Sequence, residues 1–257
     1  EKAVSYIESR AKAGGPFFLY VPLASPHTPI VPNAPFQGKS GLNPYADFVM
    51  ETDAALGKIL KALDEHELAE NTLLVLTSDN GCSPQANFAE LEQHGHDPSY
   101  VFRGHKADLF EGGHRIPFLV RWPGIVRAGT TSDQTICLTD LFATCADFMK
   151  AEVPEDAAED SVSFLPVLRR QDRGPLREAT VHHSIDGSFS IRQDNWKLLL
   201  CPGSGGWSTP RPGQDDVSGL PRVQLYDLSA DAGETQNVQS EHPQLVARLT
   251  ALLEKYV

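Results

Sequence analysis

Two apolar runs of strand length flank a stretch with helical periodicity in the first third of the chain, and this order limits the fold more than any other feature. Pro16–Leu23 is the first run, and Thr72–Thr77 is the second. Between them, apolar residues recur every three or four positions, which predicts a helix. Asn43 is suited to cap this helix and Pro44 to occupy its first position. A strand, a helix and a second strand in this order predict a right-handed crossover within a mostly parallel sheet. We therefore expect an α/β fold.

The pattern continues with a third apolar run and then changes. Ile116–Trp122 predicts a third strand, and Thr139–Lys150 predicts a helix after it. The acidic stretch Ala151–Asp160 follows. It marks the boundary that we expect between the C-terminal half of an α/β domain (residues 1–155) and a small C-terminal α+β subdomain (residues 156–257).

Short extended segments alternate with Gly and Pro turns beyond Arg177, which predicts a small antiparallel sheet. The expected strands are Ala179–Ser184, Ser188–Arg192, Trp196–Cys201 and Val223–Leu228. His242–Val257 then has the leucine spacing of an amphipathic terminal helix. The sequence thus predicts helices flanking a mostly parallel sheet, followed by a second, antiparallel sheet with its own helix.

The charge balance excludes some classes of protein. The 257 residues hold 34 acidic and 22 basic side chains, a formal net charge of −12. A nucleic-acid-binding surface is therefore not expected, because it needs a surplus of Lys and Arg. No apolar run approaches the roughly 20 residues that span a bilayer, so we expect no membrane span. One segment differs: between Arg103 and Arg127, four arginines and one lysine stand against two acidic residues, which favours binding of an anion.

Polar residues follow the first two predicted strands directly. His27 follows the first strand, on a loop that two prolines stiffen. Asp79 and Asn80 follow the second, before a glycine that permits a sharp turn. Ligands in such sheets bind beyond the carboxyl ends of the strands. The carboxylate and the amide of the adjacent pair are hard oxygen ligands for Ca²⁺ or Mg²⁺, while an Asx turn that only ends the strand is the alternative.

The segment 82–114 is rich in His and Gly and is typical of a long loop, and loops of this length in compact domains are usually functional. Lys106 and His105 lie in its cationic part, where they could hold an anion; ordinary salt bridges in a solvated loop are the alternative. His94 and His96 add two imidazoles that could contact a substrate or a transition metal, although no third ligand stands at a telling spacing. We take Lys106 and His27 as candidate catalytic residues and the three other histidines as candidate substrate contacts.

Five stretches stand in a telling order along the chain. They are Pro16–Pro29 with its Pro-His-Thr-Pro, the helix ending in Leu68–Asn71, Thr77–Gly81, Gly104–Lys106 with Glu111–Pro117, and Leu225–Leu228 with Glu234–Val238. Together they resemble the formylglycine-dependent, arylsulfatase-like sulfatases of the alkaline phosphatase superfamily. The resemblance covers nearly the whole chain, and it implies a partial alkaline-phosphatase-like sheet flanked by helices.

The resemblance also implies roles for individual residues. In that family an Asp and an Asn matching Asp79 and Asn80 bind Ca²⁺, a histidine matching His27 contacts the sulfate or the leaving oxygen, and a lysine matching Lys106 holds a sulfate oxygen. The expected activity is that of a sulfuric ester hydrolase, the metal-assisted hydrolysis of an aryl or carbohydrate sulfate ester. The divalent cation polarises sulfate oxygens, while Lys and His offset charge on the equatorial and leaving oxygens.

The chain also departs from the family's pattern. The family's nucleophile is a formylglycine made from the Cys or Ser of a Cys/Ser-x-Pro-x-Arg signature, which does not occur in this chain. Cys82-Ser83-Pro84 imitates its first half, but Ala86 stands where Arg is required, so we take Cys82 as an unmodified cysteine. The paired aspartates that complete the metal site are absent as well. We therefore expect the C-terminal part of a sulfatase, with the formylglycine in an N-terminal portion and no complete catalytic site in this chain alone.

Two alternative functions and several partners follow from these observations. A phosphoester or phosphonate hydrolase of the same superfamily would use a similar metal pair, and a non-catalytic binding or structural module would need no reactive site. The expected partners are a sulfated small molecule or carbohydrate and, over unpaired strands, the N-terminal portion of the enzyme or an oligomer partner. Bacterial family members are often exported, so the resemblance implies a periplasmic or secreted protein. We expect specificity to rest on the loops around His94–His105 and on Trp207 with the irregular Gly-, Ser- and Pro-rich insertion Pro202–Pro221 that contains it.

Overall fold

The computed structural model describes all 257 residues, and the chain divides into two compact units. The first unit consists of Glu1–Leu76, Ser83–Pro98 and Leu119–Ala128. The second consists of Thr77–Cys82, Ser99–Phe118 and Gly129–Val257. The domain boundary near residue 155 stays a prediction. No helix in the structure combines the length and the apolar composition that crossing a bilayer requires.

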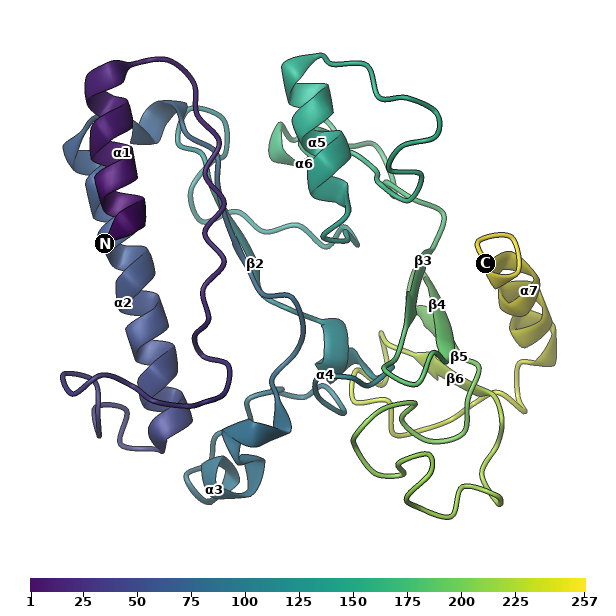
Figure 1. Cartoon of the computed structure of the whole chain (residues 1–257). Coiled ribbons are helices and arrows are strands. Elements are labelled where there is room, and N and C mark those ends of the chain that lie inside the picture. The colour runs from purple at the N-terminus through teal and green to yellow at the C-terminus, as the bar shows by residue number, and fades with distance from the viewer. The chain divides into compact units, whose positions relative to one another are not determined.

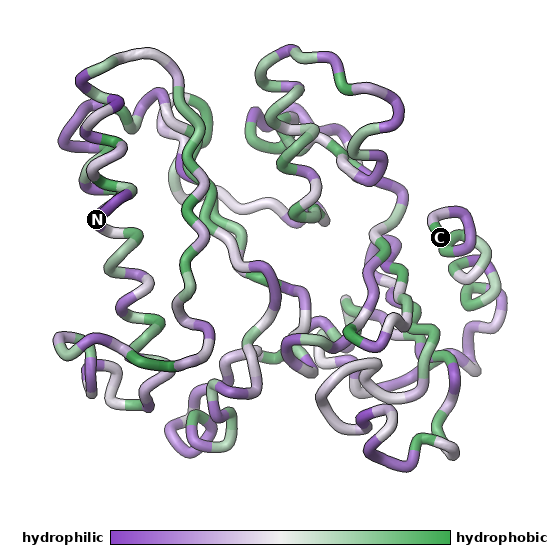
Figure 2. The backbone as a smooth tube through the Cα atoms, in the orientation of Figure 1, coloured by the Kyte–Doolittle hydropathy of each residue, from purple (hydrophilic) through white to green (hydrophobic).

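Two long helices form the core of the first unit. α1 (Lys2–Ala13) packs against α2 (Pro44–Glu65), as Figure 1 shows, and the buried residues Ile7, Ala62 and Leu63 form the contact. The predicted start of α2 is confirmed, because the Asn43 side chain accepts a hydrogen bond from the Ala46 N–H at 3.1 Å and proline occupies the first helical turn. Apolar and polar residues alternate along α2 in Figure 2, as expected for a helix with one buried face.

A two-stranded sheet joins β1 (Leu74–Thr77) to β2 (Phe118–Arg121), and the short 3₁₀ helix η1 (Ala69–Asn71) precedes β1. Both strands lie within runs that the sequence predicts as strands. The first predicted strand, Pro16–Leu23, pairs with no other strand, so that part of the prediction is wrong for this chain. A strand is defined by its hydrogen-bonded neighbours, and the described chain supplies none here.

The Pro16–Leu23 segment still shows the alternation of a half-covered strand. The side chains of Phe17 and Leu19 pack against the core that α1 and α2 form. Phe18 and Tyr20 point the other way and are 82% and 76% exposed. The apolar face that Phe18 and Tyr20 form is therefore not covered by any part of this chain.

The segment 82–114 is not one continuous loop, contrary to the sequence-based expectation. It contains the short helices η2 (Pro84–Ala86), α3 (Phe88–Gln93) and α4 (Glu111–His114). Pro84 begins η2, and the buried Leu91 anchors α3, so each turn has a local reason to form.

Two helices near the middle of the second unit are held by a buried acid. α5 (Asp140–Met149) lies within the predicted helix Thr139–Lys150, and α6 (Leu165–Leu168) packs against it. The Asp140 carboxylate accepts hydrogen bonds from the N–H groups of Cys137 at 2.7 Å and Val162 at 2.9 Å, and it forms an ion pair with Arg177.

The C-terminal part of the second unit is the predicted antiparallel sheet. Its strands, in spatial and chain order, are β3 (Thr180–His183), β4 (Phe189–Gln193), β5 (Trp196–Leu199) and β6 (Gln224–Asp227). Ile191 lies opposite Leu198, and Leu198 lies opposite Leu225. The terminal helix α7 (Pro243–Leu253) covers these residues with Leu249, Leu252 and Leu253, so the sheet and its helix share one apolar core (Figure 1).

Candidate active site

The loop after β1 carries two oxygen ligands that the protein leaves free. The Ser78 hydroxyl donates to the carbonyl oxygen of Asn80 at 2.8 Å, and the Asn80 Nδ2 donates to the carbonyl oxygen of Gly81 at 2.9 Å. These bonds shape the loop and leave the Asn80 Oδ1 without a donor. The Asp79 carboxylate is exposed and makes no hydrogen bond or ion pair within the protein. The predicted pair is therefore placed as two adjacent hard oxygen donors.

Gly81 ties this loop to α4. Its N–H donates to the carbonyl oxygen of Gly113 at 2.8 Å. A β-carbon at position 81 would overlap the carbonyl oxygen of Gly112, so only glycine allows this approach. The Asp79–Asn80 pair is consequently fixed to the turn that opens at Glu111.

Lys106 is attached to the same loop. Its backbone N–H donates to the carbonyl oxygen of Cys82 at 2.8 Å, and its half-buried side chain makes no ion pair within the protein. Three of the predicted residues, Asp79, Asn80 and Lys106, thus lie on two loops joined by backbone hydrogen bonds. One loop supplies free oxygen ligands and the other a free ammonium, which suits an anion held beside a cation.

A buried carboxylate organises the loop around Lys106. Asp108 is 4% exposed and accepts hydrogen bonds from the N–H groups of His105 at 2.8 Å, Trp207 at 2.7 Å and Ser208 at 3.0 Å. The His105 Nδ1 lies 3.6 Å from the Asp108 carboxylate and 3.1 Å from the Lys106 carbonyl oxygen. His105, expected as a substrate contact, therefore directs Nδ1 into its own loop. Asp108 also fixes the start of the insertion that contains Trp207.

The other three predicted histidines belong to the first unit and are exposed. The His27 Nδ1 lies 2.8 Å from the Thr28 carbonyl oxygen, so in the tautomer that donates there Nε2 is the free acceptor. His94 and His96 follow α3, and their side chains make no hydrogen bond. No group of three or more His, Cys, Asp or Glu side chains in the structure could hold a metal ion.

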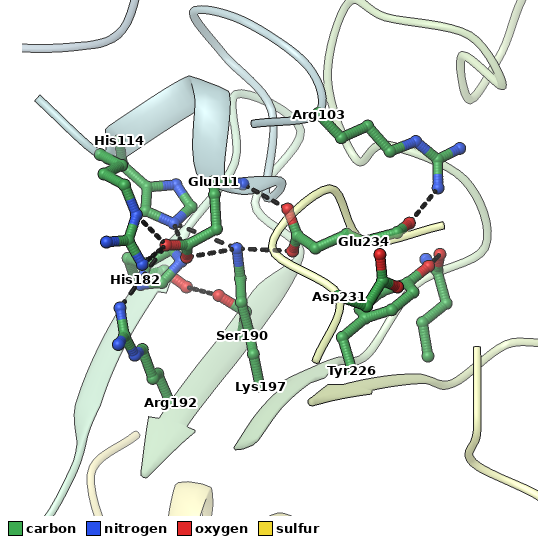
Figure 3. A network of polar contacts seen from close by, with 12 residues as sticks. Arg103, Glu111, His114, His182, Ser190, Arg192, Lys197, Tyr226, Asp231 and Glu234 are labelled. Carbon is green, nitrogen blue, oxygen red and sulfur yellow. Dashed lines mark hydrogen bonds and ion pairs between the residues drawn. The ribbon is translucent and has the colours of Figure 1, made fainter. Parts of the chain in front are cut away.

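Sequence reasoning missed a buried ion network below the α4 turn (Figure 3). Lys197 of β5 is fully buried, and its Nζ lies 3.0 Å from Glu111 Oε1 and 2.9 Å from Glu234 Oε1. The second carboxylate oxygen of Glu234 accepts the Glu111 N–H at 2.6 Å. The sequence did contain a signal for this network: Lys197 stands inside the apolar run Trp196–Cys201, which predicts a buried strand. A lysine buried in such a strand needs an acidic partner.

Four further side chains, His114, Arg115, His182 and Arg192, surround this network. Burial and nearby charges shift the pKa values of Glu111, His114 and His182. Burial raises the pKa of Glu111, but Lys197, His114 and Arg115 more than offset it and hold that pKa far below its usual range. Burial, and then the charge of Lys197, lower the pKa of His114 to about 4. Burial and then His114 lower the pKa of His182 well below its usual range; the two imidazole centroids are 3.8 Å apart. The remaining member, Arg192, lies 3.5 Å from Glu111.

An α/β fold in which the loop after β1 presents free oxygen donors and a second loop, joined to it by a backbone hydrogen bond, presents a free lysine suits a metal-assisted hydrolase of anionic esters. Comparison with known proteins identifies the family. The family model described as Sulfatase matches residues 1–151, which is more than half of the chain. The chain belongs to the sulfatase family.

Individual relatives agree with this assignment. The chain is 37% identical to an N-acetylgalactosamine-6-O-sulfatase of Bacteroides thetaiotaomicron over 98% of its own length and 49% of that protein's. It is 31% identical to human N-acetylgalactosamine-6-sulfatase, over 100% of this chain and 51% of the relative. A solved structure from work on glycosaminoglycan metabolism by Bacteroides thetaiotaomicron superposes with a TM-score of 0.86 at 37% identity, over 99% of this chain and 52% of that one. The chain thus spans about half the length of these relatives.

Proposed function

We propose that this chain is the part of a sulfatase that holds half of a Ca²⁺ site and the lysine that binds a sulfate oxygen. The observation that carries the proposal is the pair of backbone hydrogen bonds, Gly81 to Gly113 and Lys106 to Cys82, which fix free oxygen donors and a free ammonium on joined loops. The whole protein hydrolyses a sulfate ester, and the names of its relatives favour a carbohydrate such as a 6-sulfated N-acetylgalactosamine.

The residues present fit a hard divalent cation. Asp79 offers a carboxylate and Asn80 an amide oxygen, and neither oxygen is used by the protein. When bound, the cation supplies polarisation of the sulfate oxygens. Ca²⁺ is the proposed ion, and Mg²⁺ is the alternative for the same donor set.

The cationic side chains neutralise charge on the substrate. The Lys106 ammonium has no partner within the protein, so it is available to a sulfate oxygen whose charge increases as the ester bond breaks. His27 is proposed to contact the sulfate or the leaving oxygen through its free Nε2, where it can exchange a proton. His94, His96 and His105 are proposed as contacts to the rest of the substrate.

Other parts of the reaction are proposed to come from elsewhere in the full-length protein. The formylglycine signature does not occur within these residues, and the metal donors here are incomplete. The uncovered face with Phe18 and Tyr20 supports a further segment of the same enzyme, or an oligomer partner, packed on this unit. Export to the periplasm or the medium is proposed by analogy with bacterial family members.

The proposal is tested in the full-length protein with matched variants. Asp79→Ala is expected to lower Ca²⁺ affinity, measured by calorimetry, by at least about tenfold, because one of two free oxygen donors on this loop is lost. Lys106→Met is expected to lower kcat/KM for a 6-sulfated galactosamine and for a chromogenic aryl sulfate by about 100-fold. Asp53→Ala, an exposed acid on α2, is the control and should change neither quantity.

The same assays separate the alternatives. A higher kcat/KM on phosphate or phosphonate esters than on sulfate esters would identify a hydrolase of another specificity. Full activity of both Asp79→Ala and Lys106→Met would point to a non-catalytic module. Robust turnover by the 257-residue chain alone would contradict the claim that essential groups lie outside it.

A further inference from the structure

The buried network of Figure 3 connects the C-terminal sheet to α4. Glu111, Lys197 and Glu234 come from three separate stretches of the second unit, and each is at most 2% exposed. Two carboxylates and one ammonium share contacts of 2.9 and 3.0 Å, so removing the ammonium would leave two buried anions side by side. A buried network of this kind holds the segments that carry it in one geometry while it is complete, and it destabilises the fold strongly when one charge is removed.

The network acts on the backbone of α4 directly. Glu234 accepts the Glu111 N–H at 2.6 Å, and the Arg103 Nη1 donates to the Glu234 carbonyl oxygen at 2.9 Å. Gly112, which follows Glu111, donates its N–H to the Arg103 carbonyl oxygen at 2.8 Å. The position of the first residues of α4 is therefore set by charged groups from outside the helix.

From α4 the connection reaches both proposed ligand loops. Gly113 accepts the Gly81 N–H, and the carbonyl oxygen of Gly112 fills the space where a Gly81 side chain would lie. Gly81 follows Asn80, and Cys82 accepts the Lys106 N–H. A shift of α4 would displace both loops, because their backbones are in contact with no intervening side chain.

We infer that Lys197 is a positioning residue for the metal and sulfate loops, acting through the Glu111–Gly113 turn. It touches neither ligand. Its ammonium forms ion pairs with both Glu111 and Glu234 and so holds the turn against which Gly81 is fixed. The C-terminal sheet, which supplies Lys197, thereby contributes to the geometry of the site as well as to the stability of the unit. This inference rests on the proposed function, because it assumes that Asp79 and Asn80 bind the cation.

The test uses Lys197→Met in the metal-free, full-length protein, with Arg177→Met as its matched control. Arg177 also pairs with a buried acid of the second unit, Asp140, but it has no contact with α4. Both variants should lose stability. Only Lys197→Met should speed amide hydrogen exchange, by about tenfold, in peptides covering residues 78–82 and 104–108, because the Gly81 and Lys106 amides are the donors that the turn fixes. Only Lys197→Met should also lower the Ca²⁺ affinity, by about tenfold.

Equal exchange and equal Ca²⁺ affinity in the two variants would overturn the inference and leave Lys197 a structural residue. If Lys197→Met does not fold, Glu234→Gln decides, since glutamine keeps the acceptor for the Glu111 N–H and removes one charge. Glu234→Gln should speed amide exchange in the same peptides and lower the Ca²⁺ affinity by about threefold each. Wild-type exchange rates and Ca²⁺ affinity in this variant would contradict the inference. Asp79→Ala separates the two proposals. If Asp79→Ala leaves Ca²⁺ binding intact, the metal site itself is wrong; if only the Lys197 and Glu234 variants leave it intact, positioning alone is wrong.

Discussion

The Gly81 N–H donates a 2.8 Å hydrogen bond to the carbonyl oxygen of Gly113, and the two backbones approach so closely that no side chain fits at position 81. This contact joins the loop after β1 to the turn of α4. The oxygen donors of Asp79 and Asn80 therefore depend on residues far away in the sequence. Substitutions at this contact should reveal the dependence.

Gly81→Ala is expected to lower the free energy of unfolding by about 1–3 kcal/mol or more, because the added methyl group overlaps the carbonyl oxygen of Gly112. Urea denaturation of the full-length protein measures the change. Gly57→Ala is the control, since Gly57 lies in the exposed interior of α2 with open space around its Cα. It should raise the free energy by about 0.5–1 kcal/mol, because alanine favours the helix. Equal effects at both positions would contradict the close approach.

Asp108→Asn should loosen the insertion around Trp207. The buried carboxylate accepts the N–H groups of His105, Trp207 and Ser208, and an amide offers one acceptor oxygen in place of two. We expect a loss of about 2 kcal/mol in unfolding free energy, together with faster amide exchange across residues 204–208. Asp216→Asn is the control: this exposed acid accepts hydrogen bonds only from Ser218 in its own loop, so the same measurements should stay at wild-type values.

Stability should fall as the pH is lowered from about 6.5 toward about 4. Burial and Lys197 lower the pKa of His114 to about 4, and burial and His114 lower that of His182, so the unfolded chain binds protons in this range that the folded chain does not. Proton binding to the unfolded state reduces the free energy of unfolding as the pH falls. The loss should be on the order of 2 kcal/mol, measured as urea midpoints between pH 7 and pH 4.

Matched histidine variants test the source of that pH dependence. His114→Gln removes one of the two buried imidazoles and should flatten the profile between about pH 6.5 and pH 4. His96→Gln removes an exposed imidazole that makes no hydrogen bond and should leave the profile as it is. A wild-type slope in His114→Gln would show that other groups titrate.

Asn43→Ala should cost about 1 kcal/mol of unfolding free energy or more, because its side chain caps α2 and also donates to the Ala86 carbonyl oxygen at 2.9 Å. Asn43→Ser keeps an oxygen for the cap and loses the hydrogen bonds that the Asn43 Nδ2 donates to the Ala86 carbonyl oxygen and to the Glu90 carboxylate. The serine variant should therefore retain more stability than the alanine variant in thermal or urea unfolding. Equal losses would show that the cap contributes nothing.

Local patterns predicted most of the elements correctly. The start of α2 follows from a capping residue and a proline, and the four strands of the C-terminal sheet follow from short apolar runs between turns. The strand prediction for Pro16–Leu23 is wrong because periodicity does not reveal pairing: the segment has the alternation of a strand, but no strand of this chain hydrogen-bonds to it. The site residues could be placed after strand ends, yet the pattern gave no sign that His105 would face Asp108.

The sequence by itself determined most of the elements, the resemblance to sulfatases and the residue types of the proposed site, because these depend on neighbouring residues and on short motifs. The tertiary structure alone decided which polar groups meet. Lys197, Glu111 and Glu234 form one buried network, and the Gly81 backbone lies against α4, only because the chain brings distant segments together. Such contacts depend on the exclusion of water and on close packing, and neither is written in the spacing of residues along the chain.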